Sequence, residues 1–432
     1  MREEILDSLT GINYWESIPL FQLGFRRNNY ISRLEQSMGN RLIKVITGQR
    51  RTGKSYIVRQ LLDTLINKLN VNPANTFYLN KEMYEFEGIQ FADDLSATIA
   101  MYEEKYTPKG TIYLFIDEVQ NINDWERIVV SLAQHPVKQY EVFITGSNST
   151  LLSGELATLL SGRYILTEVY PFSYKEYLDY QSLENTKENF IHYISTSALP
   201  EIFNLDHAET RKHYFQSLKD TILLKDIIQR HQIRDYILLE DIFLFLLHNV
   251  GNMTSVPSIM KYFKSKKRKA DYATISAYLS YLEESYIIHS APRYSLKNKS
   301  LLSGEKKYYV NDIGFRNYLY PQLIRETGYI LENIVFMHLK IAQQDIKLGH
   351  DINFEIDFYA MDQSTSIYIQ VSYLLASEST IEREFGALER IDDNFPKYVV
   401  SMDDILIQSK KGIIHHHVWD FIYMLCIGKN IS

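Results

Sequence analysis

One octapeptide constrains the fold of this chain more than any other segment. Gly48-Gln-Arg-Arg-Thr-Gly-Lys-Ser55 fits the pattern G-x-x-x-x-G-K followed by Ser or Thr. Residues 42–47 form a β-branched apolar run before it and predict a buried strand, whereas residues 56–66 follow it with apolar side chains at helical spacing. This order of strand, loop and helix predicts a parallel α/β sheet with a phosphate-binding loop at its edge.

The residue types of this loop suit the phosphates of a nucleotide. Its glycines let successive backbone N–H groups face the phosphates at the start of a helix. Lys54 is expected to reach the β- and γ-phosphates, and the Ser55 hydroxyl to ligate magnesium. A chance match in a glycine-containing turn is the disfavoured alternative. The predicted binding residues are Gly48, Gln49, Arg50, Arg51, Thr52, Gly53, Lys54 and Ser55.

Two adjacent carboxylates follow another predicted strand. Residues 111–116 are apolar and end in Asp117 and Glu118, about 60 residues after the loop. We expect Asp117 to hold magnesium directly or through water, and Glu118 to act as general base on the attacking water. An apolar strand that ends in Asp-Glu is weak evidence alone, and the preceding loop makes it strong.

A further predicted strand, residues 141–145, runs into a polar turn. Asn148 is the candidate that orients water against the γ-phosphate, with Ser147 and Ser149 as neighbouring candidates. A turn rich in hydrogen-bonding side chains is the alternative. Arg163 precedes a fifth short strand.

These segments together resemble the AAA+ ATPases of the archaeal and bacterial type whose C-terminal domain is related to restriction-endonuclease-like folds. The resemblance covers nearly the whole chain and implies a core that binds ATP and Mg2+. It implies Walker A roles for Lys54 and Ser55, Walker B roles for Asp117 and Glu118, and a sensor role for Asn148. The motifs are Gly48–Ser55, Ile116-Asp-Glu-Val-Gln120, Ile144-Thr-Gly-Ser-Asn148, and Leu160-Ser-Gly-Arg163 followed by Tyr170-Pro-Phe-Ser173.

Two further assignments rest on this resemblance. Arg163 takes the place of an arginine finger or a sensor arginine, with a structural ion pair as the alternative. Phe25, Arg26, Arg27 and Tyr30 take the place of a segment that covers the adenine base, and a plain N-terminal helix explains them about as well.

The middle of the chain predicts a winged helix-turn-helix. Helical patterns over residues 241–250, 254–263 and 272–284 precede two short strands, at residues 286–288 and 306–310. Six positive charges fall within nine residues beside the predicted recognition helix, which favours DNA over a solvated loop or a protein-docking surface. Since 46 Lys and Arg stand against 53 Asp and Glu, DNA contact needs such a local patch. The charges are Lys261, Lys264, Lys266, Lys267, Arg268 and Lys269.

The C-terminal region resembles a restriction-endonuclease-like fold with an incomplete site. In that fold a helical Glu, a strand Asp and an [Asp/Glu]-x-Lys pair gather metal ions. Glu332 and Asp357 occupy the first two places, but the third reads Gln370-x-Ser372. A neutral amide is a poor substitute for a carboxylate on a hard cation, and nothing replaces the charge of the lysine. An inactive, scaffold or nucleic-acid-docking role is therefore favoured over a working nuclease.

Histidine and cysteine give little evidence for other sites. His415, His416 and His417 lie in a predicted strand, whose alternating side chains let at most two converge on a metal. The only cysteine, Cys426, excludes internal disulfides and zinc sites built on paired cysteines. We expect a reducing, cytoplasmic location without a secretory signal or a membrane partner.

The predicted fold class is α/β, with four parts. They are an AAA+ P-loop parallel-sheet core at 1–170, a helical lid at 171–236, a winged helix-turn-helix at 237–315 and a restriction-endonuclease-like α/β domain at 316–432. The predicted function is Mg-dependent ATP binding and hydrolysis coupled to DNA binding. A nucleotide-gated switch or protein-interaction module with slow turnover and an ATP-regulated nuclease are the alternatives. Expected partners are DNA, a protein bound through the C-terminal domain and a second copy of the chain.

Overall fold

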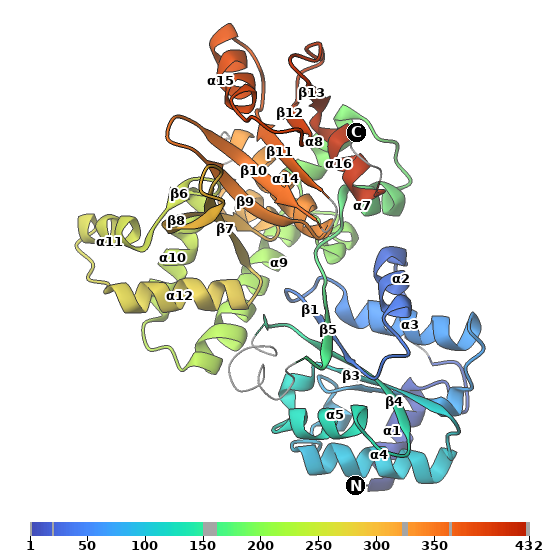
Figure 1. The fold of residues 1–432 in the computed structure, drawn as a ribbon. Helices are drawn as coiled ribbons and strands as arrows, with labels where there is room; N and C mark the ends of the chain where they lie inside the picture. The colour runs from blue at the N-terminus through green and yellow to red at the C-terminus, as the bar shows by residue number, and fades with distance from the viewer. Residues whose placement is uncertain (1, 20, 150–161, 322–326, 363–364, 429–432) are drawn as a thin grey trace. The chain divides into compact units, whose positions relative to one another are not determined.

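The computed structural model describes residues 2–19, 21–149, 162–321, 327–362 and 365–428 (Figure 1). The chain divides into two compact units, Met1–Val169 and Tyr170–Ser432. Each unit is built around its own β-sheet. Among the helices in these ranges, none combines the length and apolar character needed to cross a membrane.

The first unit contains a five-stranded parallel sheet, which confirms the predicted α/β core. The strand order is β2-β3-β4-β1-β5, and every neighbouring pair is parallel. Because both faces are covered, the central strands β1 and β4 are buried over almost their whole length and are mostly apolar, and the buried Lys44 of β1 is paired with Glu141 of β4. The strands are β1 (Ile43–Thr47), β2 (Thr76–Asn80), β3 (Thr111–Asp117), β4 (Gln139–Gly146) and β5 (Tyr164–Glu168).

Helices cover both faces of this sheet. One face packs against α2 (Asn28–Gln36) and α3 (Lys54–Asn67). The other packs against α1 (Arg2–Ile12), α4 (Ala92–Tyr106) and α5 (Trp125–Ala133). The strand β4 lies between β1 and β3, so the segments that follow these three strands meet at one edge.

The second unit is built on a mixed sheet that has eight strands within the described residues. Its order is β13-β12-β11-β10-β9-β7-β8-β6. Helices α14 (Thr327–Ile341) and α16 (Val418–Cys426) pack on one face, and α15 (Glu378–Glu389) packs on the other. The strands are β6 (Met253–Thr254), β7 (Ile288–Ser295), β8 (Ser300–Val310), β9 (Asp345–His350), β10 (Glu355–Met361), β11 (Ser366–Val371), β12 (Lys397–Ser401) and β13 (Ile413–His417).

The remaining helices precede or join this sheet. The segment that follows Pro171 is helical, and a π-helical stretch, Ile222–Gln229, continues α9 directly. The α-helices are α7 (Tyr174–Gln181), α8 (Lys187–Ser195), α9 (Ala208–Thr221), α10 (Tyr236–His248), α11 (Val256–Ser265), α12 (Tyr272–Glu284) and α13 (Gly314–Leu319). Short 3-10 helices are η1 (Pro73–Asn75), η2 (Tyr84–Phe86), η3 (Val119–Asn121) and η5 (Pro200–Asn204).

The two strands expected for the wing belong to the same sheet as the C-terminal strands. The hairpin β7–β8 pairs with β6 on one side, at Met253 and Lys307. On the other side β7 pairs in parallel with β9, with Arg293 opposite Leu348. This pairing satisfies backbone groups that a free wing would expose to solvent. The predicted boundary between the winged helix-turn-helix (237–315) and the C-terminal domain (316–432) therefore does not separate two sheets, because strands from both parts belong to one sheet.

Candidate functional site

The loop between β1 and α3 is shaped by two glycines. Gly48 has a φ of 143°, and a Cβ there would lie 2.2 Å from the carbonyl oxygen of Val169. Gly53 has a φ of 96° and directly precedes α3. Since side chains are strained or excluded at these positions, the two glycines let the backbone turn from the strand into the helix. The loop thus has the strand, turn and helix context that a phosphate-binding loop needs.

The ammonium group of Lys54 is directed into this loop. It donates to the carbonyl oxygens of Gly48 at 3.0 Å and Gln49 at 3.2 Å, and lies 3.8 Å from Glu118 Oε1. The Thr52 hydroxyl also donates to Gln49, at 3.0 Å. Lys54, Gln49 and Thr52 are buried, so the cation sits within the loop.

The other predicted loop residues lie nearer to solvent. Arg50 forms an ion pair with Glu82 at 2.9 Å, and Arg51 is exposed with a φ of 70°. Ser55 is half-buried in the first turn of α3. Of the eight predicted residues, Gly48 to Gly53 form the turn after β1, and Lys54 and Ser55 begin α3.

Asp117 is held at the carboxyl end of β3 by two hydroxyl groups. The Thr145 hydroxyl on β4 donates to Asp117 Oδ1, and the Tyr78 hydroxyl on β2 donates to Oδ2 at 3.1 Å. Arg59 of α3 in turn donates to the Tyr78 hydroxyl at 3.3 Å. Three neighbouring strands thus fix one buried carboxylate, and neither Tyr78 nor Thr145 carries a sequence signal that marks it for this role.

Glu118 adopts an unusual backbone conformation beside this carboxylate. Its φ of 56° and ψ of 50° are left-handed, and its N–H donates to Thr145 Oγ1 at 2.9 Å. Burial raises the pKa of Glu118, and Lys54 opposes that effect. Strained backbone at a buried carboxylate is often found at functional sites, and a raised pKa suits a group that accepts a proton near neutral pH.

The turn after β4 lies beside the loop because Gly146 is in register with Thr47. Asn148 and Ser147 in this turn are fully buried. The Ser147 hydroxyl has no hydrogen-bond partner among the described residues. Both side chains therefore belong to the same sheet edge as Lys54 and Asp117.

Arg163 lies at the amino ends of the strands, whereas the loop lies at their carboxyl ends. It precedes β5, where Tyr164 is in register with Ile43, and its carbonyl accepts the Ile43 N–H at 2.8 Å. At about 3.3 Å per residue, the length of β1 separates this position from the loop by about 20 Å, farther than an arginine side chain reaches. Arg163 therefore cannot be a sensor for a nucleotide in its own loop, which corrects that part of the prediction. Leu160 and Ser161 of its motif lie outside the described residues.

The segment before α2 supports the loop from within the protein. The buried Arg27 donates to the carbonyl oxygen of Thr52 at 3.0 Å and lies 4.5 Å above the ring of Tyr30. The Gln60 amide donates to the carbonyl oxygens of Leu23 at 2.6 Å and Phe25 at 2.7 Å. These bonds hold the segment against α3 and the loop before it.

Comparisons with known proteins identify the family of this chain. A family model described as AAA domain matches residues 40–178, and one described as domain of unknown function (DUF8612) matches residues 187–325. An uncharacterized protein of Haemophilus influenzae is 32% identical over 379 residues, which cover 87% of this chain and 92% of that protein. The chain belongs to this family of AAA-domain proteins.

Other relatives of this AAA-domain protein extend the comparison. Uncharacterized protein MJ1544 of Methanocaldococcus jannaschii is 30% identical over 370 residues, 81% of this chain and 78% of that protein. A solved structure, the Walker-type ATPase Paby2304 of Pyrococcus abyssi, is 15% identical with a TM-score of 0.45, and the match covers 68% of this chain and 95% of that one. The family match confirms the predicted AAA core.

The basic segment of the AAA-domain protein spans the end of α11 and the turn before α12. The side chains of its five lysines are exposed to solvent, whereas Arg268 is half-buried. Arg268 forms ion pairs with Asp235, at 2.9 Å, and with Asp241. The segment therefore presents five positive charges to solvent, and the sixth is balanced within the protein. The five are Lys261, Lys264, Lys266, Lys267 and Lys269.

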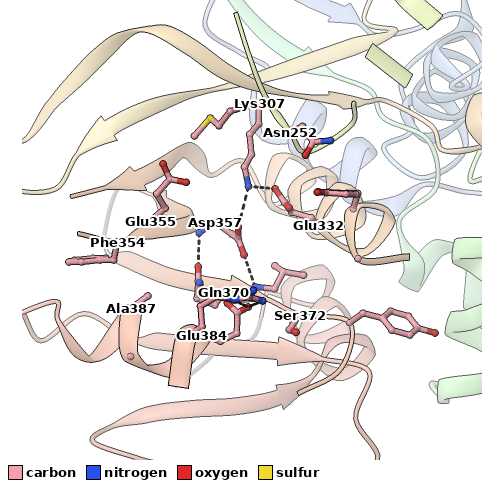
Figure 2. Close-up of a pocket in the computed structure, with 18 of the residues that line it drawn as sticks. Asn252, Lys307, Glu332, Phe354, Glu355, Asp357, Gln370, Ser372, Glu384 and Ala387 are labelled. Carbon is pink, nitrogen blue, oxygen red and sulfur yellow. Dashed lines mark hydrogen bonds and ion pairs between the residues drawn. The ribbon is translucent and has the colours of Figure 1, made fainter. Parts of the chain in front are cut away.

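The second unit also brings Glu332, Asp357 and Gln370 together, in a pocket of about 990 Å³ (Figure 2). Two residues that sequence reasoning missed join them. Lys307 extends from β8 to Glu332 and Asp357, and Glu384 on α15 accepts the Gln370 amide N–H at 2.8 Å. The expectation that nothing replaces the missing lysine charge was therefore wrong, because Lys307 enters from a strand earlier in the chain.

The three consecutive histidines do not form a metal site. His415 is buried, accepts the Ile407 N–H at 2.9 Å and bonds to the Ser401 hydroxyl at 2.8 Å. Burial lowers its pKa, which suits a neutral structural ring. Across the part of the chain that the structure describes, no group of three or more His, Cys, Asp or Glu side chains is arranged to hold a metal ion.

Proposed function

We propose that this AAA-domain protein binds ATP with Mg2+ and hydrolyses it, and that this cycle is coupled to DNA binding by the second unit. The observation that carries the proposal is the convergence of Lys54, Asp117 and Glu118. Lys54 Nζ lies 3.8 Å from Glu118 Oε1, and Asp117 directly precedes Glu118 at the end of β3. A cation for phosphates, a carboxylate for a metal and a candidate base thus share one sheet edge.

The donor set at this edge suits magnesium. The Ser55 hydroxyl and the Asp117 carboxylate offer oxygen ligands, which Mg2+ prefers together with phosphate oxygens and water. Tyr78 and Thr145 orient both carboxylate oxygens of Asp117. Bound with ATP, magnesium supplies neutralisation of phosphate charge.

Side chains of the protein would bind the phosphates, accept the proton and orient the attacking water. Lys54 would exchange its bonds to the loop carbonyls for bonds to the β- and γ-phosphates. Glu118 would accept a proton from the attacking water, and burial raises its pKa, which makes it a stronger base. Asn148 and Ser147 would orient that water. The Ser147 hydroxyl has no hydrogen-bond partner within the part of the chain that the structure describes.

The proposed DNA contact uses a winged helix-turn-helix in the second unit. Its support is the element order α10-β6-α11-α12-β7-β8, with β6 paired to β8 in antiparallel fashion. The five exposed lysines lie on α11 and in the turn between α11 and α12, beside the proposed recognition helix α12. Neutralisation of DNA phosphates by such lysines is independent of sequence and depends strongly on salt.

Steady-state phosphate release from ATP, with and without duplex DNA at two salt concentrations, tests this proposal. We expect stimulation by DNA that disappears at high salt and in a variant with Lys261, Lys264, Lys266 and Lys267 changed to Glu. Tight ATP binding with negligible turnover and no response to DNA would contradict it. That result would favour a nucleotide-gated switch or a protein-interaction module.

A further inference from the structure

The pocket that contains Glu332 and Asp357 holds a positive charge of its own. We infer that the ammonium group of Lys307 takes the place of a divalent cation between these carboxylates, so that the wild-type pocket binds no metal ion there. The site is then a latent cation site, which opens only when Lys307 is removed. This inference is independent of ATP hydrolysis in the first unit.

The position of Lys307 is the first argument. Its Nζ lies 2.8 Å from Glu332 Oε1 and 3.2 Å from Asp357 Oδ1, and so bridges α14 and β10 (Figure 2). The exposed fractions are 13% for the Lys307 side chain, 9% for Glu332 and 21% for Asp357. A metal ion shared by the same two oxygens would have to occupy the position of the ammonium group.

Charge balance is the second argument. A carboxylate withdrawn from water is costly unless it is paired, and an ammonium group provides that pairing. Burial disfavours the charged form of Lys307, but Asp357 and Glu332 outweigh it and raise the Lys307 pKa. Lys307 therefore stays protonated and acts as a permanent counter-ion.

Each of the two carboxylates accepts a further hydrogen bond, Glu332 at the same Oε1 that Lys307 contacts and Asp357 at its other oxygen. Glu332 Oε1 accepts a bond from the Tyr309 hydroxyl at 2.7 Å. Asp357 Oδ2 accepts the backbone N–H of Val371 at 3.0 Å. A metal ion would therefore have to displace the lysine from an already bonded pair of carboxylates.

The third metal-ligand position of a nuclease-like site is also closed. Gln370 uses both ends of its amide, since Oε1 accepts the Asp357 N–H at 2.7 Å and Nε2 donates to Glu384 at 2.8 Å. Glu384 is further bonded to Arg383 at 2.6 Å. Glu384 thus binds Gln370 and Arg383 rather than supplying a third ligand beside Glu332 and Asp357. These contacts disagree with the metal centre that the nuclease resemblance implies.

Removal of the ammonium group would reverse this balance. Two carboxylates without a counter-ion would then line a pocket of about 990 Å³, which has ample room for a hydrated ion. Mg2+ and Mn2+ are bound by one or two carboxylates together with water. A Lys307→Met chain should therefore gain a divalent-cation site that the wild-type chain lacks.

Titration of the full chain with Mn2+, without nucleotide, tests this inference. The titration is repeated at pH values from about 7 to about 8.5, because burial raises the Glu332 pKa to about 7 even though Lys307 lowers it, and loss of Lys307 raises that pKa further. Mn2+ binding to Lys307→Met therefore competes with a proton on Glu332 and should strengthen as pH rises. Lys307→Met should bind one more Mn2+ than wild type, and Asp357→Asn in that background should remove the extra site. Mn2+ should also raise the melting temperature of Lys307→Met but not that of Lys307→Met/Asp357→Asn.

Lys306→Met is the matched control, because Lys306 neighbours Lys307 on β8 and does not line the pocket. It should bind Mn2+ as wild type does. A folded Lys307→Met chain with no additional site would overturn the inference. If Lys307→Met does not fold, the number of Mn2+ ions bound by wild type is compared with the number bound by Asp357→Asn. Equal numbers support the inference. A Mn2+ site present in wild type and lost in Asp357→Asn contradicts it.

Discussion

The Thr145 hydroxyl donates a hydrogen bond to the carboxylate of Asp117. The same oxygen accepts the Glu118 N–H at 2.9 Å, so one side chain on β4 positions both carboxylates that follow β3. Because Thr145 acts through its bonds to Asp117 and Glu118, we regard it as a positioning residue.

A Thr145→Val change should weaken the use of magnesium more than the binding of nucleotide. Valine preserves the shape of the side chain but leaves Asp117 Oδ1 without its donor, a loss of about 1–2 kcal/mol. We expect roughly a tenfold rise in the Mg2+ concentration that gives half-maximal ATP hydrolysis. Thr167→Val, at a buried position on β5, is the control and should leave this value unchanged. An unchanged magnesium requirement in Thr145→Val would exclude the positioning role.

The stability of the second unit should depend on the protonation of His338. This buried ring accepts the Tyr174 N–H at Nε2, at 2.9 Å, and its Nδ1–H donates to the Ile334 carbonyl at 2.8 Å. Burial lowers its pKa to about 4, below the unfolded value of 6.5. Its contribution is therefore complete above about pH 6.5 and is lost as pH falls toward 4, by up to about 3 kcal/mol.

Urea unfolding of wild type and His338→Gln across this pH range measures the effect. The free energy of unfolding should fall less steeply with acid in His338→Gln than in wild type. His213→Gln, at a side chain that is 74% exposed, should keep the wild-type dependence. Identical acid dependence in wild type and His338→Gln would show that the ring does not remain neutral in the folded state.

Lys266 and Arg268 should differ in their effects on DNA binding. Lys266 is exposed, whereas Arg268 pairs with Asp235 and Asp241. Lys266→Ala should reduce the slope of log affinity against log salt by about 0.9 if it neutralises one phosphate. Arg268→Ala should instead lower the melting temperature and change the slope less. Fluorescence anisotropy with a labelled duplex measures both slopes, and a larger effect of Arg268→Ala would reverse the assignment.

The sequence predicts the proximity of the loop and the two carboxylates at one sheet edge because the determinants of that arrangement are local. Gly48, Gly53 and Lys54 act within one turn, and an apolar strand leads directly into Asp117 and Glu118. Parallel strands bring such carboxyl ends to the same edge. Tyr78 and Thr145 could not be predicted, since their contacts with Asp117 depend on the order of strands in the sheet.

The contact of Lys307 with the C-terminal pocket could not be predicted from residue spacing. Lys307 precedes Glu332 and lies on a strand expected to form a wing, so no spacing connects it with Asp357. The link arises because β7 pairs with β9 and joins two expected domains in one sheet. The strands β9 and β12 and the helix α15 were not predicted, because short strands and an amphipathic helix with many charges give weak periodic signals.

The most direct test of ATP hydrolysis at this sheet edge compares Lys54→Ala with Glu118→Gln in the full chain. ATP binding and steady-state phosphate release are measured with Mg2+ for both variants and wild type. We predict that Glu118→Gln binds ATP like wild type but loses turnover about a hundredfold or more, because general-base catalysis is removed. Lys54→Ala should lose both binding and turnover. Wild-type turnover in both variants would contradict the account.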